Sequence, residues 1–106
     1  MYSQEFFGPV FLLFKVDTEA AAIELANDSN YGLAGSVVSS DLERAERVAK
    51  EIETGMVFIN SPAAGSAALP FGGVKNSGYG RECGDEGFRY FTNLKTIAIP
   101  WFGSEF

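Results

Sequence analysis

Apolar residues form three short runs along the chain, at 10–16, 33–39 and 56–59. The first run, Val-Phe-Leu-Leu-Phe-Lys-Val, is apolar without the alternation expected of a strand that has one face in water. Strands buried on both faces, as in parallel sheets, have this pattern. The runs therefore predict three strands, of which the first should be buried on both faces.

Residues 19–27, between the first two runs, have the spacing of an amphipathic helix. Either Asp17 or Thr18 is placed to accept a hydrogen bond from an N–H group of the first turn. The sequence Asn-Asp-Ser-Asn and the glycine at position 32 end the helix. Its apolar face comprises Ala22, Ile23 and Ala26.

A second helix is predicted after the second run, and it begins with the sequence Ser-Asp-Leu-Glu at 40–43. This is a capping box, in which Ser40 and Glu43 each satisfy a backbone donor of the other. Gly55 is placed to end the helix. Its apolar face comprises Leu42, Ala45, Val48, Ala49 and Ile52. The ion pairs predicted on its outer face are Glu43 with Arg47 and Glu46 with Lys50.

The order strand–helix–strand–helix–strand indicates an α/β protein whose strands are parallel neighbours. A glycine-rich loop follows at 70–82, then a short helix at 85–91 and an alternating strand at 94–99. The expected fold is a three-layer βαβαβ fragment with a mainly parallel sheet. We divide it into residues 1–91 and a C-terminal strand and tail, 92–106.

Composition narrows the classes of function. The 106 residues carry a net charge of −6 without a cluster of Lys and Arg, which argues against nucleic acid and anionic membranes as partners. No apolar run is long enough to span a bilayer, and no basic leader segment is visible. The chain has no histidine and one cysteine, Cys83, as expected of a cytoplasmic protein without a metal site. Ten phenylalanines in so small a domain indicate a surface that a partner covers.

The loop at 70–82 contains four glycines, which favour sharp turns and close backbone approach. It lacks the G-x-x-x-x-G-K-[ST] order of a phosphate loop, and Cys83 stands where a dinucleotide fingerprint needs a third glycine. We expect a fixed loop that closes over a site or a subunit contact. The alternative is that its glycines only make turns.

Four segments of the chain resemble the NAD(P)-dependent aldehyde dehydrogenase superfamily, in the order and spacing of its C-terminal portion. The clearest is Pro-Phe-Gly-Gly-Val-Lys-Asn-Ser-Gly-Tyr-Gly-Arg-Glu at 70–82. The others are Gln-Glu-Phe-Phe-Gly-Pro-Val at 4–10, Ala-Asn-Asp-Ser-Asn-Tyr-Gly-Leu-Ala at 26–34, and Gly-Met-Val-Phe-Ile-Asn at 55–60. The last of these and the glycine loop look similar to succinate-semialdehyde dehydrogenases.

The resemblance implies functions for four residues. Glu5 corresponds to a glutamate that hydrogen-bonds the nicotinamide ribose, and Phe7 to an aromatic residue that packs against the nicotinamide. Phe71 corresponds to an aromatic residue of the aldehyde channel. Ser66 lies in the segment that shapes substrate choice, where a serine of succinate-semialdehyde dehydrogenases binds the substrate carboxylate. From the residues alone, the alternatives are a solvated Glu5, a core Phe7 and a Ser66 hydroxyl facing water.

The resemblance also implies a reaction, the oxidation of an aldehyde to an acid with NAD or NADP. A cysteine thiolate attacks the aldehyde, a hydride passes to the cofactor, and water hydrolyses the thioester. In the family the nucleophile and the general base lie upstream of the position of Glu5. We therefore expect no catalytic residue in this chain, a buried structural role for Cys83, and no turnover and little cofactor binding by the isolated chain.

The family uses the strand at 94–100 to pair with a neighbouring subunit, which implies a homo-oligomer that acts on a small aldehyde. Two alternatives stay open at this point. One is a stand-alone remnant that only assembles, and the other is a degenerate domain that binds a small ligand. The sequence leaves the particular aldehyde, the choice of NAD or NADP and the oligomeric state open.

Overall fold

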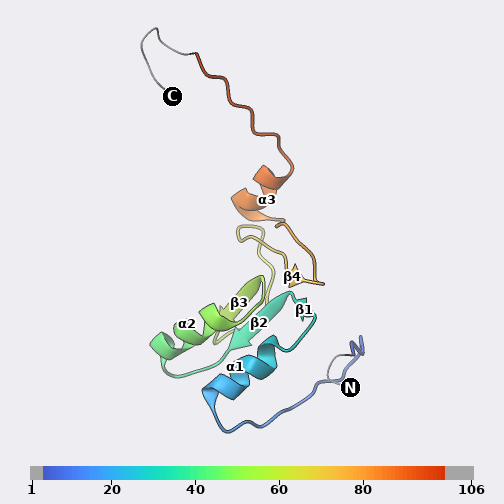
Figure 1. Cartoon of the computed structure of the whole chain (residues 1–106), viewed down its shortest axis with the longest axis vertical. Helices are drawn as coiled ribbons and strands as arrows, with labels where there is room; N and C mark the ends of the chain where they lie inside the picture. Colours follow the sequence, from blue (N-terminus) through green and yellow to red (C-terminus); the bar gives the residue numbers. More distant parts are fainter. Residues whose placement is uncertain (1–3, 100–106) are drawn as a thin grey trace.

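The computed structural model describes residues 4–99, in which helices and strands alternate along the chain (Figure 1). The α/β class predicted from the sequence is confirmed. The elements, in order, are α1 (Glu19–Asn27), β1 (Tyr31–Gly32), β2 (Ala34–Val37), α2 (Leu42–Glu51), β3 (Met56–Ile59), β4 (Val74–Lys75) and α3 (Gly84–Tyr90).

Strands β2 and β3 form a parallel pair, and α2 is the crossover between them. The register pairs Ala34 with Met56 and Val37 with Ile59. At Gly35 an added Cβ would lie 3.3 Å from Ile52 Cγ2, so the C-terminal end of α2 packs closely on the sheet. Ala45 of α2 is 0% exposed, and among the described residues it is the one apolar side chain that is fully buried.

Strands β1 and β4 form a second, antiparallel pair, in which Tyr31 lies opposite Lys75 and Gly32 opposite Val74. The prediction of a mainly parallel sheet is therefore correct only for β2 and β3. The reason is that the glycine loop folds back along the chain that precedes β2. There Ser77 Oγ accepts a hydrogen bond from the N–H of Gly32 at 3.0 Å.

Two predicted strands are absent from the described part of the chain. Residues 10–16 and 94–99 are not assigned to strands, and their apolar side chains are exposed, as in Phe11 (87%) and Leu94 (99%). A strand needs a neighbouring strand to satisfy its backbone groups, and neither segment has one here. Pro100, part of the predicted oligomerisation strand, lies outside the described residues.

The helix caps correct the sequence predictions in detail. Thr18 caps α1 and accepts a hydrogen bond from the Ala21 N–H at 3.1 Å, which decides between Asp17 and Thr18. Asp41 caps α2 and accepts from the Arg44 N–H at 3.0 Å, so the capping box that would begin at Ser40 does not form. Because Asp41 has a short carboxylate and extended backbone angles, it can serve as N-cap itself.

The end of α2 and the exposure of its first residue also differ from the predictions. The helix ends at Glu51 with Ile52 as its C-cap, so Gly55 is not the residue that ends it. Leu42, predicted on the apolar face, is 60% exposed at the first position of the helix.

Helix α1 is attached to the rest of the chain by polar contacts at both of its ends. Glu19 in its first turn forms ion pairs with Arg44 and Arg47 of α2. Asn27 in its last turn donates to the Glu51 carbonyl and accepts from the Glu53 N–H, both at 2.8 Å. The predicted Glu43–Arg47 pair is absent from the described residues because the Arg47 guanidinium turns toward α1 instead.

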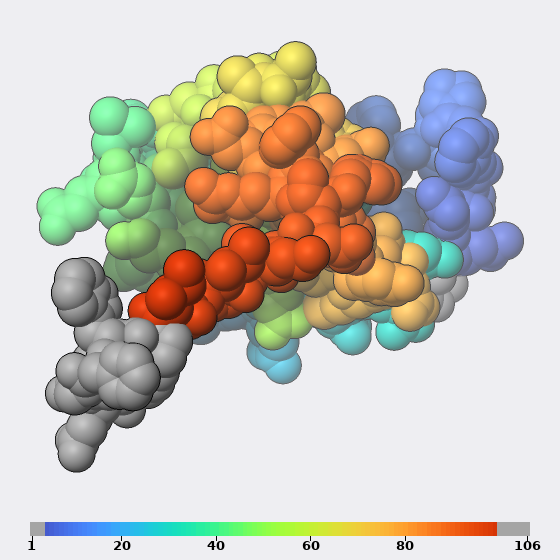
Figure 2. Space-filling view, turned by 90° about the horizontal axis from the view of Figure 1, so that it is seen from above, coloured from blue at the N-terminus to red at the C-terminus, as the bar shows by residue number. Residues whose placement is uncertain are grey.

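The molecule is long and open. Its extents are 67 × 32 × 23 Å and its radius of gyration is 19.4 Å, against about 13 Å for a compact domain of this length. Its accessible surface is 9064 Å² for 11.4 kDa, where a compact monomer would expose about 5,800 Å². Helix α3 and residues 92–99 extend away from the two sheets (Figure 1), and residues 4–16 lie to one side (Figures 1 and 2). Most large apolar side chains therefore lack cover.

Candidate functional site

The glycine loop at 70–82 is held by hydrogen bonds at its base and across it. Phe71 and Glu82 form a bridge at its base, in which the Phe71 N–H donates to the Glu82 carbonyl at 2.6 Å and the Glu82 N–H donates back at 2.8 Å. Arg81 crosses the loop and donates from Nη1 to the carbonyls of Gly73 (2.9 Å) and Gly80 (2.6 Å). These bonds hold the Phe71 backbone in one place.

Two glycines allow the loop to pass close to its neighbours. A Cβ on Gly55 would lie 1.9 Å from the carbonyl oxygen of Gly72, so only glycine lets the start of β3 reach the loop. Gly80 has φ 79°, and a Cβ there would lie 2.6 Å from the Tyr90 ring. The glycines therefore do more than make turns, because they bring β3, the loop and α3 into contact.

A cavity of about 280 Å³ lies between the start of β3 and the segment that leads into the glycine loop. Phe71 and Ser66, both predicted to bind substrate, line it together. Ser66 Oγ accepts a hydrogen bond from the Ala68 N–H at 3.2 Å, which leaves the hydroxyl proton available for donation. The remaining lining residues are Gly55, Met56, Val57, Phe58, Ala64, Leu69 and Pro70.

Strand β3 contributes a wall to this cavity that the apolar pattern does not predict. Met56 and Phe58 belong to an apolar run that the pattern assigns only to a strand. Gly55, just before the strand, was the available signal, because a glycine at a strand end marks a close backbone approach. The approach to Gly72 is what places β3 beside the loop.

Glu5 and Phe7 lie apart from this cavity, on the N-terminal segment. Both are exposed, Phe7 to 94%, and neither lines the cavity. The Phe7 backbone has φ 46°, an unusual conformation for a residue with a side chain. The Val10 N–H donates to the Gly8 carbonyl at 2.7 Å, so a tight turn follows. The structure therefore brings together the two predicted substrate residues and leaves the two predicted cofactor residues separate from them.

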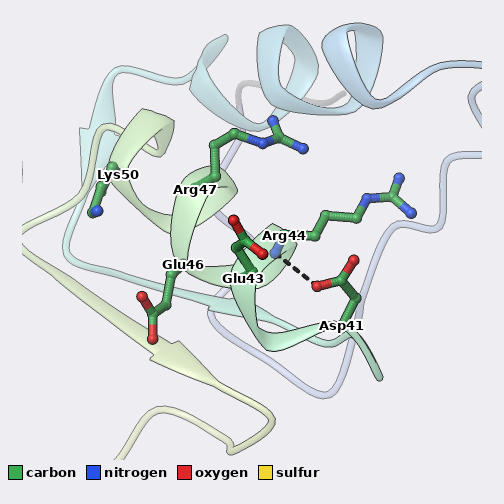
Figure 3. A pocket seen from close by; sticks show the side chains of 6 residues that line it. All are labelled: Asp41, Glu43, Arg44, Glu46, Arg47 and Lys50. Carbon is green, nitrogen blue, oxygen red and sulfur yellow. Dashed lines mark hydrogen bonds between the residues drawn. The ribbon is translucent and has the colours of Figure 1, made fainter.

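A larger hollow of about 450 Å³ lies on the outer face of α2 (Figure 3). Its lining is wholly charged: Asp41, Glu43, Arg44, Glu46, Arg47 and Lys50. Arg44 and Arg47 extend toward α1, where hydrogen bonds from Arg47 and Arg44 lower the pKa of Glu19 to about 2. Two of its three cations, Arg44 and Arg47, already pair with Glu19, and carboxylates alternate with the cations, so this face joins two helices and offers no coherent site for a charged ligand.

Cys83 is exposed, which corrects the expectation of a buried residue. It precedes α3 with φ 61°, and this turned backbone directs it away from the interior. Within residues 4–99 no group of three or more His, Cys, Asp or Glu side chains is arranged to hold a metal ion. Over the same residues, no helix has the length and apolar character needed to cross a bilayer.

Comparison with known proteins places this chain in a family. The family model described as "Aldehyde dehydrogenase family" matches residues 1–97. The chain belongs to the aldehyde dehydrogenase family, as its motifs predicted.

Individual relatives agree with this assignment. The chain is 54% identical over 100 residues to succinate-semialdehyde dehydrogenase [NADP(+)] of Deinococcus radiodurans, covering 93% of this chain and 21% of that protein. It is 48% identical to chloroplastic betaine aldehyde dehydrogenase of Atriplex hortensis, covering 95% and 21%. The chain thus spans about a fifth of the length of the curated relatives it matches.

Solved structures show the same fold. Succinic semialdehyde dehydrogenase from Streptococcus pyogenes, in complex with NADP+, superposes with a TM-score of 0.90 at 56% identity, covering 93% of this chain and 22% of that one. Mycobacterium tuberculosis aldehyde dehydrogenase, complexed with NAD+, gives 0.88 at 45% identity, covering 98% and 21%. The relatives are therefore NADP+- or NAD+-dependent enzymes of about five times this length.

Proposed function

We propose that this chain forms the C-terminal part of an NAD(P)-dependent aldehyde dehydrogenase and supplies one wall of its substrate site. The observation that carries the proposal is the cavity of about 280 Å³ that Phe71 and Ser66 line together. An apolar wall with one hydroxyl suits a short aldehyde that carries a polar group at its far end. The cavity is formed by fixed backbone, since Phe71 belongs to the bridged base of the glycine loop.

We further propose succinate semialdehyde, or an aldehyde with a similar carboxylate, as the substrate. The Ser66 hydroxyl has a free proton to donate to that carboxylate, while Phe71 packs against the carbon chain. The names of two relatives, from Deinococcus radiodurans and Streptococcus pyogenes, support this choice. Other relatives act on bulkier aldehydes by their names, so the preference is a property to be measured on this cavity.

Glu5 and Phe7 have side chains that suit the nicotinamide and its ribose, which are their proposed ligands. The Glu5 carboxylate is exposed and, within the described residues, forms no ion pair, so its oxygens can accept from the two hydroxyls of a nicotinamide ribose. Phe7 presents an exposed ring two residues away. NAD or NADP, when bound, accepts the hydride. Glu5 would orient the ribose, and Phe7 would shield one side of the ring from water.

The isolated chain is proposed to be inactive. The nucleophile and the general base implied by the family resemblance lie outside this chain, and Cys83 has no histidine in the sequence to activate it. The single exposed thiol also suits a reducing, cytoplasmic setting. A second candidate role, assembly with other chains, is favoured by the exposed side chains of Leu94, Ile97 and Ile99.

A chimeric enzyme tests the proposal directly. Residues 1–106 would replace the matched 100-residue stretch of the Deinococcus radiodurans enzyme, and NADPH formation would be measured with succinate semialdehyde and with betaine aldehyde. We expect turnover with preference for succinate semialdehyde. A folded chimera without turnover on either aldehyde would overturn the proposed function, whereas preference for betaine aldehyde would overturn only the substrate.

A further inference from the structure

Asn60 lies directly after strand β3, and its side chain continues the hydrogen bonding between β2 and β3. The Asn60 N–H donates to the Val37 carbonyl at 2.9 Å, which extends the parallel pair past Ile59. Beyond that bond, Asn60 Oδ1 accepts from the Ser39 N–H at 2.8 Å, and Nδ2 donates to the Ser39 carbonyl at 2.9 Å. One amide thus binds both backbone groups of Ser39, and we call this contact the Asn60 clamp.

Both the backbone and the side chain of this position suit asparagine. Asn60 has φ 54°, in the left-handed region, so the chain turns out of the sheet at this point. Asparagine is one of the few residues with a side chain that adopt this region readily. Its carboxamide also offers a donor and an acceptor, whereas aspartate would only accept and glycine would do neither. The position therefore combines a turn with a fixed direction of departure.

The segment that follows, residues 61–69, contains neither a helix nor a strand and brings Ser66 to the substrate cavity. Within residues 4–99, positions 61–65 make no backbone–backbone hydrogen bond. Regular structure therefore does not determine the path of these residues. The direction in which the chain leaves the sheet determines it, and the Asn60 clamp sets that direction.

The far end of this segment has anchors of its own. The Gly84 N–H donates to the Ala67 carbonyl at 3.0 Å, and Phe71 is bridged to Glu82. The bond to Ala67 fixes one point next to Ser66 but leaves the preceding chain free to rotate about it, so the clamp supplies the second fixed point. Loss of the clamp should therefore displace the Ser66 hydroxyl more than the Phe71 ring.

We infer that Asn60 is a positioning residue for the aldehyde: its clamp on Ser39 fixes the start of the segment and thereby aims the Ser66 hydroxyl at the polar end of the substrate. The inference rests on the proposed function, since it takes the substrate and the role of Ser66 from there. Asn60 itself does not line the cavity. A misplacement of about 1 Å, caused by a change remote from the substrate, can cost roughly a hundredfold in activity, so such a residue can matter.

The chimera described above tests the inference through substrate affinity. Asn60→Gly removes the clamp and keeps the turned backbone, because glycine readily adopts φ 54°. We expect KM for succinate semialdehyde to rise about fivefold with kcat unchanged, and KM for propionaldehyde, which has no carboxylate, to change less than about twofold. An unchanged KM for succinate semialdehyde, or a similar rise for both aldehydes, would overturn the inference.

Ser61→Ala is the matched control. Ser61 is the next residue along the chain, and its hydroxyl donates to the neighbouring Pro62 carbonyl at 3.1 Å, so its loss leaves the clamp intact. We expect both KM values to stay as they are in the unmodified chimera. An equal rise in the control and in Asn60→Gly would mean that any change at the start of the segment has the same effect, which would overturn the inference.

A double-mutant cycle shows whether Asn60 acts through Ser66. If the clamp aims the hydroxyl, Asn60→Gly should add nothing to the KM increase caused by Ser66→Ala, whereas increases that multiply would overturn the inference. Should the glycine variant fail to fold, Asn60→Asp replaces it in the cycle, because aspartate keeps the acceptor for the Ser39 N–H and loses the donor to the Ser39 carbonyl. An unchanged KM in that variant would overturn the inference as well.

A measurement without substrate separates this inference from the proposed function. The Ala68 N–H donates to Ser66 Oγ at 3.2 Å and so reports the place of that hydroxyl. Amide hydrogen exchange of Ala68 should be at least about threefold faster in Asn60→Gly than in Ser61→Ala. Equal exchange would overturn the inference. Faster exchange in a chimera that has no turnover would remove the proposed function and leave the hold of the clamp on Ser66.

Discussion

Glu19 and Arg47 join the first two helices: Arg47 Nη1 lies 2.7 Å from Glu19 Oε1, across 28 positions of sequence. Arg44 reaches the other carboxylate oxygen, so one acid receives two guanidinium groups. Helix α1 contains no buried residue, and this contact and the bonds of Asn27 at its other end join it to α2 and to the residues that follow α2.

Stability of this contact should depend on pH in the acid range. The hydrogen bonds from Arg47 and Arg44 lower the pKa of Glu19 from its ordinary 4.5 to about 2 in the folded chain. A depressed folded pKa means that the stabilisation is fully present above pH 4.5 and is lost as pH falls toward 2. Amide hydrogen exchange in α1 should accelerate over that window, relative to exchange in α2, in the chimera.

Glu19→Gln should remove this extra pH dependence of α1 exchange, because the amide does not titrate there. Glu43→Gln is the control, since Glu43 forms no ion pair within the described residues and lies on the same face of α2 as Arg47. An unchanged acid response in Glu19→Gln would show that other carboxylates hold α1.

Asn27→Ala should loosen the junction of α1 with the entry to β3. The substitution removes the acceptor of the Glu53 N–H and the donor to the Glu51 carbonyl. At about 0.5–1.5 kcal/mol for each hydrogen bond, protection of the Glu53 amide should fall roughly tenfold. Asn30→Ala, whose side chain makes no such bond among the described contacts, should leave it unchanged. Equal exchange in both variants would contradict this role for Asn27.

Gly55→Ala should disrupt the cavity. The added methyl group would lie 1.9 Å from the Gly72 carbonyl oxygen. The backbone of Gly55 and that of Gly72 cannot separate without displacing β3 or the glycine loop. We expect a loss of roughly 3 kcal/mol in stability, at the upper end of overpacking costs. Gly65→Ala is the control, because nothing lies within 4 Å of its added methyl group. Thermal unfolding of the two chimeras measures the difference. Equal melting temperatures would contradict the close approach of Gly55 to Gly72.

Ser66→Ala should reveal the polar end of the substrate. If the hydroxyl binds a carboxylate, its loss should raise KM for succinate semialdehyde about tenfold or more, with kcat unchanged, because hydrogen bonds to charged groups contribute about 1.5–3 kcal/mol. KM for propionaldehyde, which has no carboxylate, should stay constant. A parallel rise for both aldehydes would mean that Ser66 only shapes its loop.

Cys83→Ala should leave the turnover of the chimera unchanged while abolishing one site of thiol labelling. Cys83 is exposed and lies at the start of α3, and it lines neither the substrate cavity nor the hollow on α2. NADPH formation measures the turnover, and iodoacetamide labelling followed by mass spectrometry measures the loss of the labelled site. Loss of turnover in this variant would show that Cys83 takes part in the reaction.

The local sequence predicted the elements whose stabilising contacts lie within a few residues of one another. Helix α1, strand β3 and the turns of the glycine loop follow from spacing, apolar runs and turn residues whose partners are nearby. The start of α2 was misplaced by one residue because Ser40 and Asp41 are both good N-caps, and a serine followed three residues later by glutamate favours the wrong one. Local patterns rank such alternatives poorly.

Contacts between distant segments could not be predicted from the local sequence pattern. The antiparallel pairing of β1 with β4 and the ion pairs of Glu19 join residues at least 25 positions apart, and no local spacing encodes them. The predicted strands at 10–16 and 94–99 show the reverse case. Their residues favour strands, yet without a neighbouring strand the backbone has no ladder to complete.

The sequence by itself determined the family and the residues to look at, because motifs such as 70–82 are written in consecutive positions. Tertiary structure alone decided that Ser66 and Phe71 share a cavity, that β3 walls it, and that Glu5 and Phe7 stand apart from it. The physical reason is that a cavity depends on how closely two backbones approach. In this chain that distance is set by Gly55 against Gly72, seventeen positions away.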